Sequence, residues 1–473
     1  MFLRTALALV TLLGSLVALP ALARFDVTAA DIAVRAFMAK EGIPAAHVTI
    51  IRGDKVLLQR GFSAGGVNGP VPDAASIFPL GSISKQFTAA TILALFDAGK
   101  VRLDASVGDY LPEWFADEPA LRISHLLSQT SGLADFLWLE GYRPLADNSA
   151  TPIAAYVALA AAAPRRFAPG ARWAYSNTNY KALALIVERV TGRSFDSVLA
   201  DLVLRPAGLD GIMSCHSLRP DQFVPGVSAE GRHTPLDASA AAYVGDGGLC
   251  GNAAALVKWI RFGLVPSNGR LSRLALPSRL ADGTQVPYGF GLSTREFLGH
   301  PMVWHGGNVD SHSSMIAYLP EEDLALVILT SKGFVWLTEL MPALLGDATP
   351  ARASASGQPP SGRFEDGLFR YVVTPDGDTL HVEIDLIGPL SFRPAGPREY
   401  VAEKYPATFR IRLPADGSRD RFELDWGEVR SYARRVGGWS TAASGICLDQ
   451  LCRSPSSGWS GQHSAGSGRT AQE

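Results

Sequence analysis

The sequence predicts an α+β domain followed by a small all-β domain, and two patterns carry this prediction. Between residues 25 and 345, strand-like segments stand at both ends and helix-like segments lie between them, which is typical of one antiparallel sheet assembled from both ends of a domain. Beyond residue 362, apolar and polar residues alternate, for example over 380–386, as in a half-buried strand. A chain of 473 residues has room for both domains.

The first 23 residues have the pattern of an export signal. Arg4 precedes an almost continuous apolar run over 6–19, and Ala21-Leu22-Ala23 supplies a small-x-small cleavage site, so that Arg24 begins the mature chain. The alternative is a retained membrane anchor, because the run is nearly long enough to span a bilayer. The cleavage pattern favours removal. We therefore expect a secreted or periplasmic protein that is not held by a membrane.

Two β-hairpins and several helices are predicted in the large domain. The first hairpin joins 48–51 to 55–58 through a Gly-Asp turn, and the second joins 313–319 to 324–330. Helical patterns follow Ser84, Asn179 and Asn252. The expected organisation is a leader at 1–23, a large α+β domain at 24–345, an Ala/Ser/Pro/Gly-rich linker at 346–362, a small antiparallel β domain at 363–452 and a disordered tail at 453–473.

Composition narrows the class of protein without indicating its chemistry. Hydrophobic residues make up 47% of the chain and charged residues 19%, which is too apolar for a disordered protein. Lys and Arg number 43 against 45 Asp and Glu, a net charge of −2. A nucleic-acid-binding protein needs a basic footprint. We therefore expect no nucleic-acid partner.

Export places the four cysteines in an oxidising compartment. Spacing alone fixes no pairing, and the locally plausible pairs are Cys215 with Cys250 and Cys447 with Cys452. A zinc site is the alternative, but no histidine stands at ligand spacing beside these cysteines. We expect no metal.

The first motif whose side chains could take part in a reaction is Ser82-Ile83-Ser84-Lys85, at the start of an apolar helical pattern. Ser82 and Lys85 lie three residues apart and therefore share one helix face. A serine hydroxyl is a poor nucleophile unless a base removes its proton, and a neighbouring lysine can take part in that step. At a helix N-terminus the free N–H groups also favour developing negative charge. The alternative is an N-capped surface helix with an exposed lysine.

The second motif is Tyr175-Ser176-Asn177, on a loop introduced by Pro169-Gly170. A tyrosine can move protons and an amide can hold a substrate carbonyl. Asn179 is expected to cap the helix that follows. The alternative is a packed tyrosine and a capping asparagine without any catalytic part.

The third motif is His305-Gly306-Gly307-Asn308, before the late hairpin. Glycines in a strand let its backbone approach another group closely. A single histidine is more often structural than catalytic, but its position before two glycines favours a site.

Together, in the order S-x-x-K, Y-x-N and H-x-G, the three motifs resemble the serine β-lactamase and penicillin-binding-protein superfamily. The residues that flank these motifs resemble the class C branch of the superfamily, which includes β-lactamases, D-aminopeptidases, D,D-carboxypeptidases and esterases. The resemblance covers roughly residues 30–340. The matching segments are Phe78–Lys85, Gly99–Asp104, Tyr110–Pro112, Ile123–Leu133 and Tyr175–Tyr180.

The resemblance implies a β-lactamase-like fold, an antiparallel sheet flanked by helices plus an all-helical lobe, and it implies residue roles. Ser82 is the acylated nucleophile, and Lys85 and Tyr175 share the role of general base. Asn177 orients the substrate, and His305 and Gly307 belong to the substrate-binding strand. The backbone N–H groups of Ser82 and Asn308 form the oxyanion hole. No cofactor is implied.

One departure from the pattern bears on the substrate. His305 stands where many relatives have a lysine, a permanent cation suited to a substrate carboxylate, whereas histidine has an ordinary pKa of about 6.5. Histidine here is commoner in esterase and aminopeptidase relatives. We therefore rank a serine hydrolase of D-amino-acid peptides or small esters first and a β-lactamase or D,D-peptidase second. A non-catalytic binding protein is third, because Ser82, Lys85, Tyr175 and Asn177 are all present.

Nearby residues are given lesser roles. We expect Asp135 and Phe136 to line the pocket, and Asp246-Gly247-Gly248 to shape the backbone near the site without acid catalysis. His125 and His312 are expected to be structural.

Overall fold

The computed structural model describes ten segments of the chain: 25–65, 70–148, 150–233, 243–264, 272–297, 300–346, 359–366, 369–385, 387–426 and 429–437. The predicted leader, the Cys447–Cys452 pair, the C-terminal tail and most of the predicted linker lie outside these residues. No helix of the described segments has both the length and the apolar character needed to cross a membrane.

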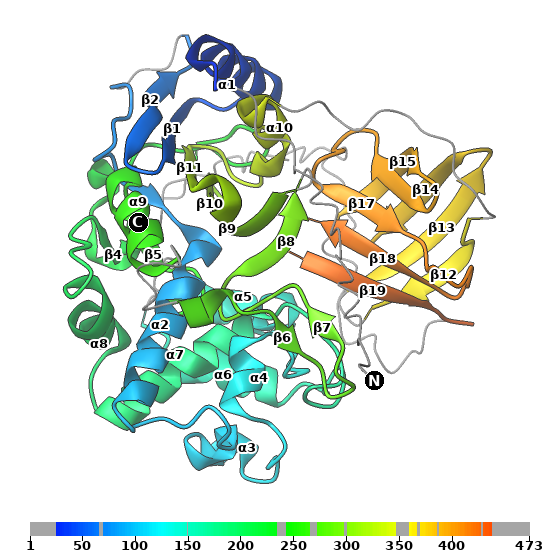
Figure 1. Ribbon diagram of the computed structural model, residues 1–473. Coiled ribbons are helices and arrows are strands. Elements are labelled where there is room, and N and C mark those ends of the chain that lie inside the picture. Colours follow the sequence, from blue (N-terminus) through cyan, green and yellow to red (C-terminus); the bar gives the residue numbers. More distant parts are fainter. Residues whose placement is uncertain are drawn as a thin grey trace, which may run out of the picture.

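Strands from both ends of the large domain form one six-stranded antiparallel sheet, in the order β2-β1-β11-β10-β9-β8 (Figure 1). This confirms the prediction of a sheet assembled from both ends. Ala46 pairs with Thr330, and Arg52 with Leu324, so residues 272 to 284 positions apart in the sequence lie side by side. The strands are β1 (Ala45–Arg52), β2 (Lys55–Ser63), β8 (Ser293–Phe297), β9 (His300–Val309), β10 (His312–Leu319) and β11 (Leu324–Thr330).

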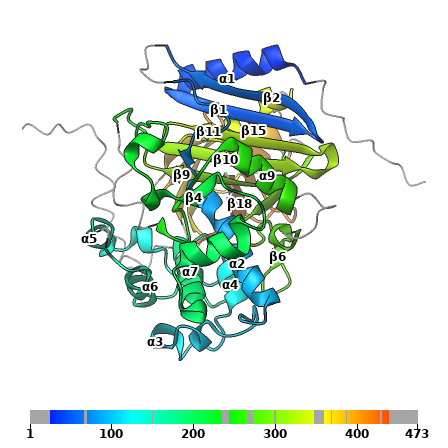
Figure 2. The same ribbon diagram turned by 90° about the vertical axis from the view of Figure 1, so that its left-hand side faces the viewer.

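Each face of this sheet is covered by helices. On one face α1 (Val27–Glu41) and α10 (Met341–Leu345) pack on side chains such as Leu326 and Ile328. On the other face α9 (Ala253–Gly263) and the helical lobe pack on alternate residues of the same strand, and Figure 2 shows α1 on the side of the sheet opposite to α2 and α9. Successive side chains of β11 therefore point alternately into the two hydrophobic cores, one on each face of the sheet.

The helical lobe is centred on α2 (Ser84–Asp97) and α7 (Asn177–Thr191), which are buried on almost every face. Asn179 does not cap α7, contrary to our prediction. The helix begins three residues earlier, at Asn177 with Ser176 as its N-cap, and the Asn179 side chain binds Ser131 and Gln129 instead. The remaining helices of the lobe are α3 (Pro112–Phe115), α4 (Ile123–Leu127), α5 (Tyr142–Ala146), α6 (Ile153–Ala161) and α8 (Phe195–Leu199).

Two smaller sheets complete the large domain. β3 (Phe78–Pro79), β5 (Leu249–Gly251) and β4 (Ile212–Ser214) pair in that order. The predicted disulfide between Cys215 and Cys250 is present beside β4, with the two Cα atoms 4.9 Å apart. β6 (Ser278–Arg279) and β7 (Gln285–Val286) form a short hairpin.

The C-terminal part is a closed antiparallel barrel of β12 to β19, which gives the predicted all-β domain a specific architecture. It packs against the large domain through Trp336, whose ring lies 5.2 Å from that of Phe409, and through a hydrogen bond between Thr338 and Thr408. The strands are β12 (Gly362–Glu365), β13 (Arg370–Asp376), β14 (Thr379–Ile384), β15 (Gly388–Gly396), β16 (Glu399–Ala402), β17 (Phe409–Arg412), β18 (Arg421–Trp426) and β19 (Val429–Arg435).

Candidate active site

Ser82 lies in a single 3-10 turn, Gly81–Ile83, between strand β3 and helix α2. Gly81 has a φ of +51°, and a Cβ there would lie 2.8 Å from the backbone nitrogen of Asn308. Only glycine therefore allows β9 to run this close to the turn. Lys85 follows in the first turn of α2, on the same side as Ser82.

The Lys85 side chain is fully buried and is held by three oxygen atoms. Its Nζ donates to Ser82 Oγ at 2.9 Å, to Asn177 Oδ1 at 2.7 Å and to the backbone oxygen of Asp246 at 2.7 Å. A lysine ammonium has three donors and no acceptor. This environment therefore suits the charged form of Lys85, with every N–H engaged.

Tyr175 approaches Ser82 from the loop before α7. Its hydroxyl donates to Ser82 Oγ at 2.9 Å, and Lys85 Nζ lies 4.9 Å from the centre of its ring. The structure thus brings together Ser82, Lys85, Tyr175 and Asn177, which are up to 95 residues apart in the sequence.

Asp135 positions Asn177. The backbone N–H and the side-chain amide of Asn177 both donate to Asp135 Oδ2, at 3.0 and 2.9 Å. Burial raises the pKa of Asp135 above the ordinary carboxyl value. The sequence marked Asp135 as a pocket-lining residue, and the structure gives it a more specific role: it fixes the amide that contacts Lys85.

Lys181 was not singled out from the sequence, although it belongs to the same network. It lies one helical turn after Asn177, and its Nζ is 3.1 Å from Asp246 Oδ1 and 3.0 Å from the backbone oxygen of Val244. Both charged side chains are buried, and burial lowers the pKa of Lys181 and raises that of Asp246. Asp246 thus acts through its backbone, as expected, while its carboxylate is anchored by Lys181.

His305 is placed differently from our prediction. Its ring is 0% exposed, Nε2 lies 3.1 Å from the Tyr288 hydroxyl, and Nδ1 lies 2.6 Å from the backbone oxygen of Gly306. Burial lowers the pKa of His305 to about 3, so the ring is neutral near pH 7. Both nitrogens face the protein, so His305 positions Tyr288 and does not offer substrate a direct contact.

Gly307 and Asn308 bring strand β9 to the nucleophile. A Cβ on Gly307 would lie 1.9 Å from the backbone oxygen of Leu80, which no side chain permits. The side chain of Asn308 is fixed by Ser313, whose hydroxyl donates to Asn308 Oδ1 at 2.7 Å. The Asn308 backbone nitrogen therefore lies beside the Ser82 turn, and the oxyanion hole of Ser82 and Asn308 stays a prediction. Among the described residues, no cluster of three or more His, Cys, Asp or Glu side chains is suited to a metal ion.

The fold and this constellation define a protein of the β-lactamase-like class, with a serine and a lysine on one helix turn and a tyrosine facing both. The chain belongs to the Beta-lactamase family, whose model matches residues 30–339.

Curated relatives share slightly less than a third of their aligned residues with the chain. The chain is 29% identical over 359 residues to a D-aminopeptidase of Gluconobacter oxydans, an alignment that covers 72% of this chain and 66% of the relative. It is 28% identical over 332 residues to a D-aminopeptidase of Brucella ovis, with 66% and 62% covered. The chain thus spans slightly less than two thirds of the length of these relatives.

Solved structures share the fold. The octameric penicillin-binding protein homologue from Pyrococcus abyssi has a TM-score of 0.59 at 20% identity, over 86% of this chain and 100% of that one. The D-stereospecific amidohydrolase from a Streptomyces species has a TM-score of 0.57 at 23% identity, over 68% and 100%.

Proposed function

We propose that the chain is an exported serine hydrolase that forms an acyl-enzyme at Ser82 and cleaves amides of D-amino acids, with small esters as further substrates. One observation carries this proposal: Ser82 Oγ accepts hydrogen bonds from both Lys85 and Tyr175, at 2.9 Å each. A serine hydroxyl flanked by two proton-handling groups at the start of a helix is an activated nucleophile.

The geometry favours Tyr175 as the group that takes the proton of Ser82. Lys85 directs its donors at three acceptors and has no lone pair to offer in that form. In the reacting form Tyr175 is a phenolate beside the Lys85 cation, and the hydrogen bond between the two oxygens runs from Ser82 to Tyr175. As Ser82 Oγ bonds to the substrate carbonyl carbon, its proton passes to the Tyr175 phenolate and the negative charge moves to the carbonyl oxygen. Breakage of the C–N bond releases the amine, which takes that proton. Water then repeats the steps on the ester and regenerates Ser82.

The preference for D-amino-acid amides rests on the relatives and on His305. Relatives named D-aminopeptidase align with the chain, and this name indicates removal of an N-terminal D-residue. In this chain the neutral, buried His305 supplies no cation at the strand where a lysine would hold a substrate carboxylate. This favours neutral amides and esters over β-lactams and peptide C-termini, which carry a carboxylate.

Export is supported by the N-terminal pattern and by the Cys215–Cys250 disulfide, since disulfides persist in oxidising compartments. Expression of the full chain with its own leader in a Gram-negative host tests this point. We expect the periplasmic fraction to hold a mature protein that begins at Arg24, and a protein retained uncleaved in the cytoplasm would contradict the proposal.

A stereochemical substrate panel tests the activity. It holds D- and L-alanine p-nitroanilide, p-nitrophenyl acetate and a chromogenic cephalosporin. We expect cleavage of the D-anilide and the ester, slow turnover of the L-anilide and the cephalosporin, and no turnover by Ser82→Ala. Fast cephalosporin hydrolysis without anilide cleavage would establish the β-lactamase alternative. No turnover of any compound by the folded protein would establish a binding protein.

A further inference from the structure

Gln129 is a buried glutamine in a backbone conformation that favours glycine. Its φ is +61°, and the residue is 0% exposed. It follows Ser128, the C-cap of α4, at the position where a left-handed residue ends many helices and where glycine is usual. A residue with a side chain is strained in this conformation, and such strain concentrates at functional sites. The reaction at Ser82 as described so far gives Gln129 no part.

The residue accepts hydrogen bonds from the peptide groups on both sides of Tyr175. Its backbone oxygen accepts from the backbone N–H of Ala174 at 2.9 Å, and its Oε1 accepts from the backbone N–H of Ser176 at 3.0 Å. Ala174 and Ser176 are buried, and they directly precede and follow the tyrosine in the chain. A single residue therefore fixes the backbone on both sides of Tyr175.

A further contact fixes the orientation of the Gln129 amide. Its Oε1 also accepts from Nδ2 of Asn179, whose own Oδ1 accepts from the Ser131 hydroxyl. The amide nitrogen of Gln129 is buried and has no hydrogen-bond partner in the described segments. A buried donor without an acceptor lowers stability. The Gln129 side chain therefore acts through its acceptor oxygen alone.

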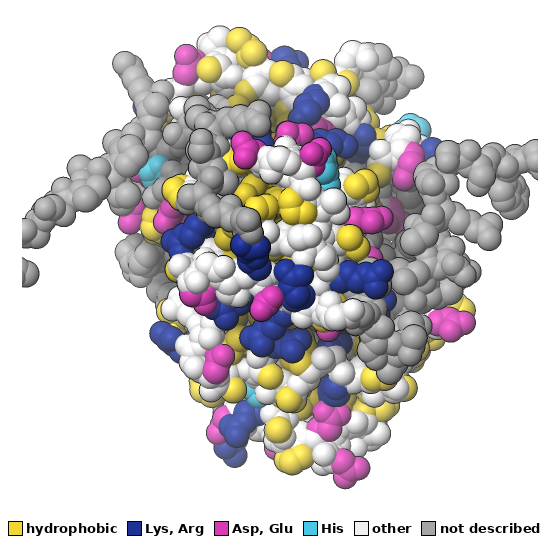
Figure 3. All heavy atoms as spheres, turned by 90° about the vertical axis from the view of Figure 1, so that its right-hand side faces the viewer, with side chains coloured by type: hydrophobic (Ala, Val, Ile, Leu, Met, Phe, Trp, Pro, Cys, Tyr) yellow, Lys and Arg dark blue, Asp and Glu magenta, His cyan; other side chains and the backbone are white. Residues whose placement is uncertain are grey.

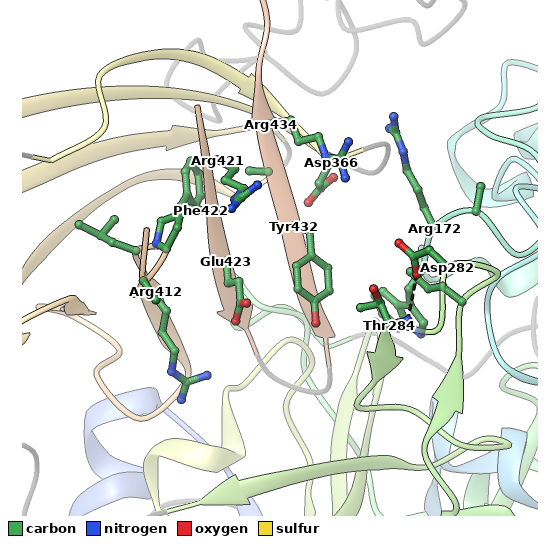
Figure 4. A pocket seen from close by; sticks show the side chains of 17 residues that line it. Arg172, Asp282, Thr284, Asp366, Arg412, Arg421, Phe422, Glu423, Tyr432 and Arg434 are labelled. Atoms are coloured by element: carbon green, nitrogen blue, oxygen red, sulfur yellow. Dashed lines mark hydrogen bonds between the residues drawn. The ribbon is translucent and has the colours of Figure 1, made fainter. Parts of the chain in front are cut away.

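The loop that leads to Tyr175 has fewer contacts where it borders a cavity. Residues 171–173 line this cavity of about 380 Å³ from the large domain, and strands β17 to β19 line it from the barrel (Figure 4). Lys and Arg side chains form a band across the barrel side of the molecule (Figure 3), and exposed ion pairs such as Arg421 with Asp416 contribute little to rigidity. The hydrogen bonds to Gln129 instead hold the residues next to Tyr175.

The position of Tyr175 matters because its oxygen must stay close to two groups. It lies 2.9 Å from Ser82 Oγ, and the centre of its ring lies 4.9 Å from Lys85 Nζ. Proton transfer requires heavy atoms within hydrogen-bond distance. A displacement of about 1 Å at a reacting group can lower a rate about a hundredfold. A small shift of the Tyr175 backbone is therefore enough to slow the reaction.

We propose that Gln129 is a positioning residue for the reaction at Ser82, whose two carbonyl oxygens hold the peptide groups on both sides of Tyr175 and so keep the tyrosine oxygen beside Ser82 Oγ. This inference rests on the proposed function, because it takes Tyr175 as the group that receives the proton of Ser82. Gln129 is fully buried and acts through Tyr175, so its loss slows the chemical step more than it weakens substrate binding.

The rate at which a fluorophosphonate labels Ser82, followed by mass spectrometry, tests the proposal for any class of substrate. Gln129→Met keeps the length of the side chain and removes its acceptor oxygen. It should label at least tenfold more slowly than the parent. With D-alanine p-nitroanilide, kcat should fall at least tenfold and KM should change less than threefold.

Gln129→Asn separates positioning from folding. Asparagine tolerates the left-handed conformation better than most residues with a side chain, so this variant should keep a melting temperature close to that of the parent. Its amide is one methylene shorter and cannot reach the N–H of Ser176. It should therefore label Ser82 at least fivefold more slowly than the parent, although it folds.

Gln86 supplies a matched control on α2. It is also a fully buried glutamine, its Oε1 accepts from the indole N–H of Trp259, and its amide nitrogen has no hydrogen-bond partner in the described residues. Gln86→Met should lower the melting temperature about as much as Gln129→Met does. Its labelling rate should stay within threefold of the parent rate.

A double-mutant cycle with Tyr175→Phe shows whether Gln129 acts through the tyrosine. In that background Gln129→Met should lower the residual labelling rate less than twofold. Labelling at the parent rate by folded Gln129→Met or Gln129→Asn, an equal loss in Gln86→Met, or independent losses in the cycle would each overturn the proposal. A parent protein that is not labelled at Ser82 would instead refute the proposed function, and this proposal with it.

Discussion

Replacing Lys181 by methionine is predicted to destabilise the protein strongly, and replacing Asp246 by asparagine at the same time is predicted to restore most of the loss. The two charges are buried 3.1 Å apart. Removal of one partner from a buried ion pair leaves an uncompensated charge and costs about 3–5 kcal/mol, whereas removal of both charges is often close to neutral. At roughly 2 °C per kcal/mol for a domain of this size, Lys181→Met should lower the melting temperature by about 6–10 °C.

The pH dependence of this deficit has a definite sign. Burial raises the pKa of Asp246 above the ordinary value of 3.8, and the loss of Lys181 removes a group that opposes this rise. A carboxyl whose pKa is raised in the folded state costs stability at high pH and ceases to do so as it takes up a proton at low pH. The deficit of Lys181→Met should therefore shrink as the pH falls towards the ordinary carboxyl value.

Thermal unfolding and amide-cleavage rates of the two single variants and the double variant form the assay. The Asp246 carbonyl accepts a hydrogen bond from Lys85, so displacement of Asp246 in Lys181→Met should weaken that bond. We expect kcat/KM to fall about 10–100-fold, which corresponds to the loss of one hydrogen bond to a charged group. The double variant should recover most of this activity. Asp31→Asn is the control, because it weakens two surface ion pairs, with Arg35 and Arg60, and should cost about 1 kcal/mol or less for each pair. If the losses of the two single variants simply add in the double variant, the reasoning is refuted.

Three further predictions concern other parts of the fold. Replacing Cys215 and Cys250 by alanine opens a loop of 35 residues and should cost about 4 kcal/mol in chemical denaturation, and an unchanged midpoint would contradict this. Gly307→Ala should lower kcat more than tenfold or prevent folding, because its Cβ meets the Leu80 backbone, whereas Gly65→Ala, in open space, should change neither. Burial lowers the pKa of His305 to about 3, so the folded state should lose stability as the pH falls below the ordinary histidine pKa of about 6.5. The loss from this residue should reach about 2 kcal/mol at pH 5. Melting curves of His305→Gln should show a smaller loss of stability over the same pH range.

The parts of the site that were predictable from the sequence are those whose contacts follow from local geometry or from the family pattern. Ser82 and Lys85 meet because they lie one helix turn apart, and Tyr175 and Asn177 accompany them in the pattern that the chain resembles. Lys181 and Asp246 are 65 residues apart, and no spacing rule connects them. The available signal was a lysine inside an otherwise apolar stretch of α7, since such a charge must find a partner when buried.

Burial and strand pairing explain the other differences between the sequence-based expectations and the structure. The sequence shows that residue 305 is a histidine but not that β9 is covered on both sides there, and this covering makes the ring neutral and turns it towards Tyr288. In the same way, alternation over 380–386 predicts a strand with one buried face but cannot tell an open sheet from a closed barrel. Closure requires pairing of β12 with β19, two strands whose partners no local pattern specifies.

The central claim is that Ser82 carries the acyl group during turnover. Intact-mass spectrometry of the protein, quenched in the steady state with D-alanine p-nitrophenyl ester and followed by peptide mapping, tests it most directly. The account predicts one D-alanyl group per chain, located on Ser82, and no adduct in Ser82→Ala, which keeps Lys85 and Tyr175. A stable adduct on another residue, or turnover at the parent rate by Ser82→Ala, would contradict it.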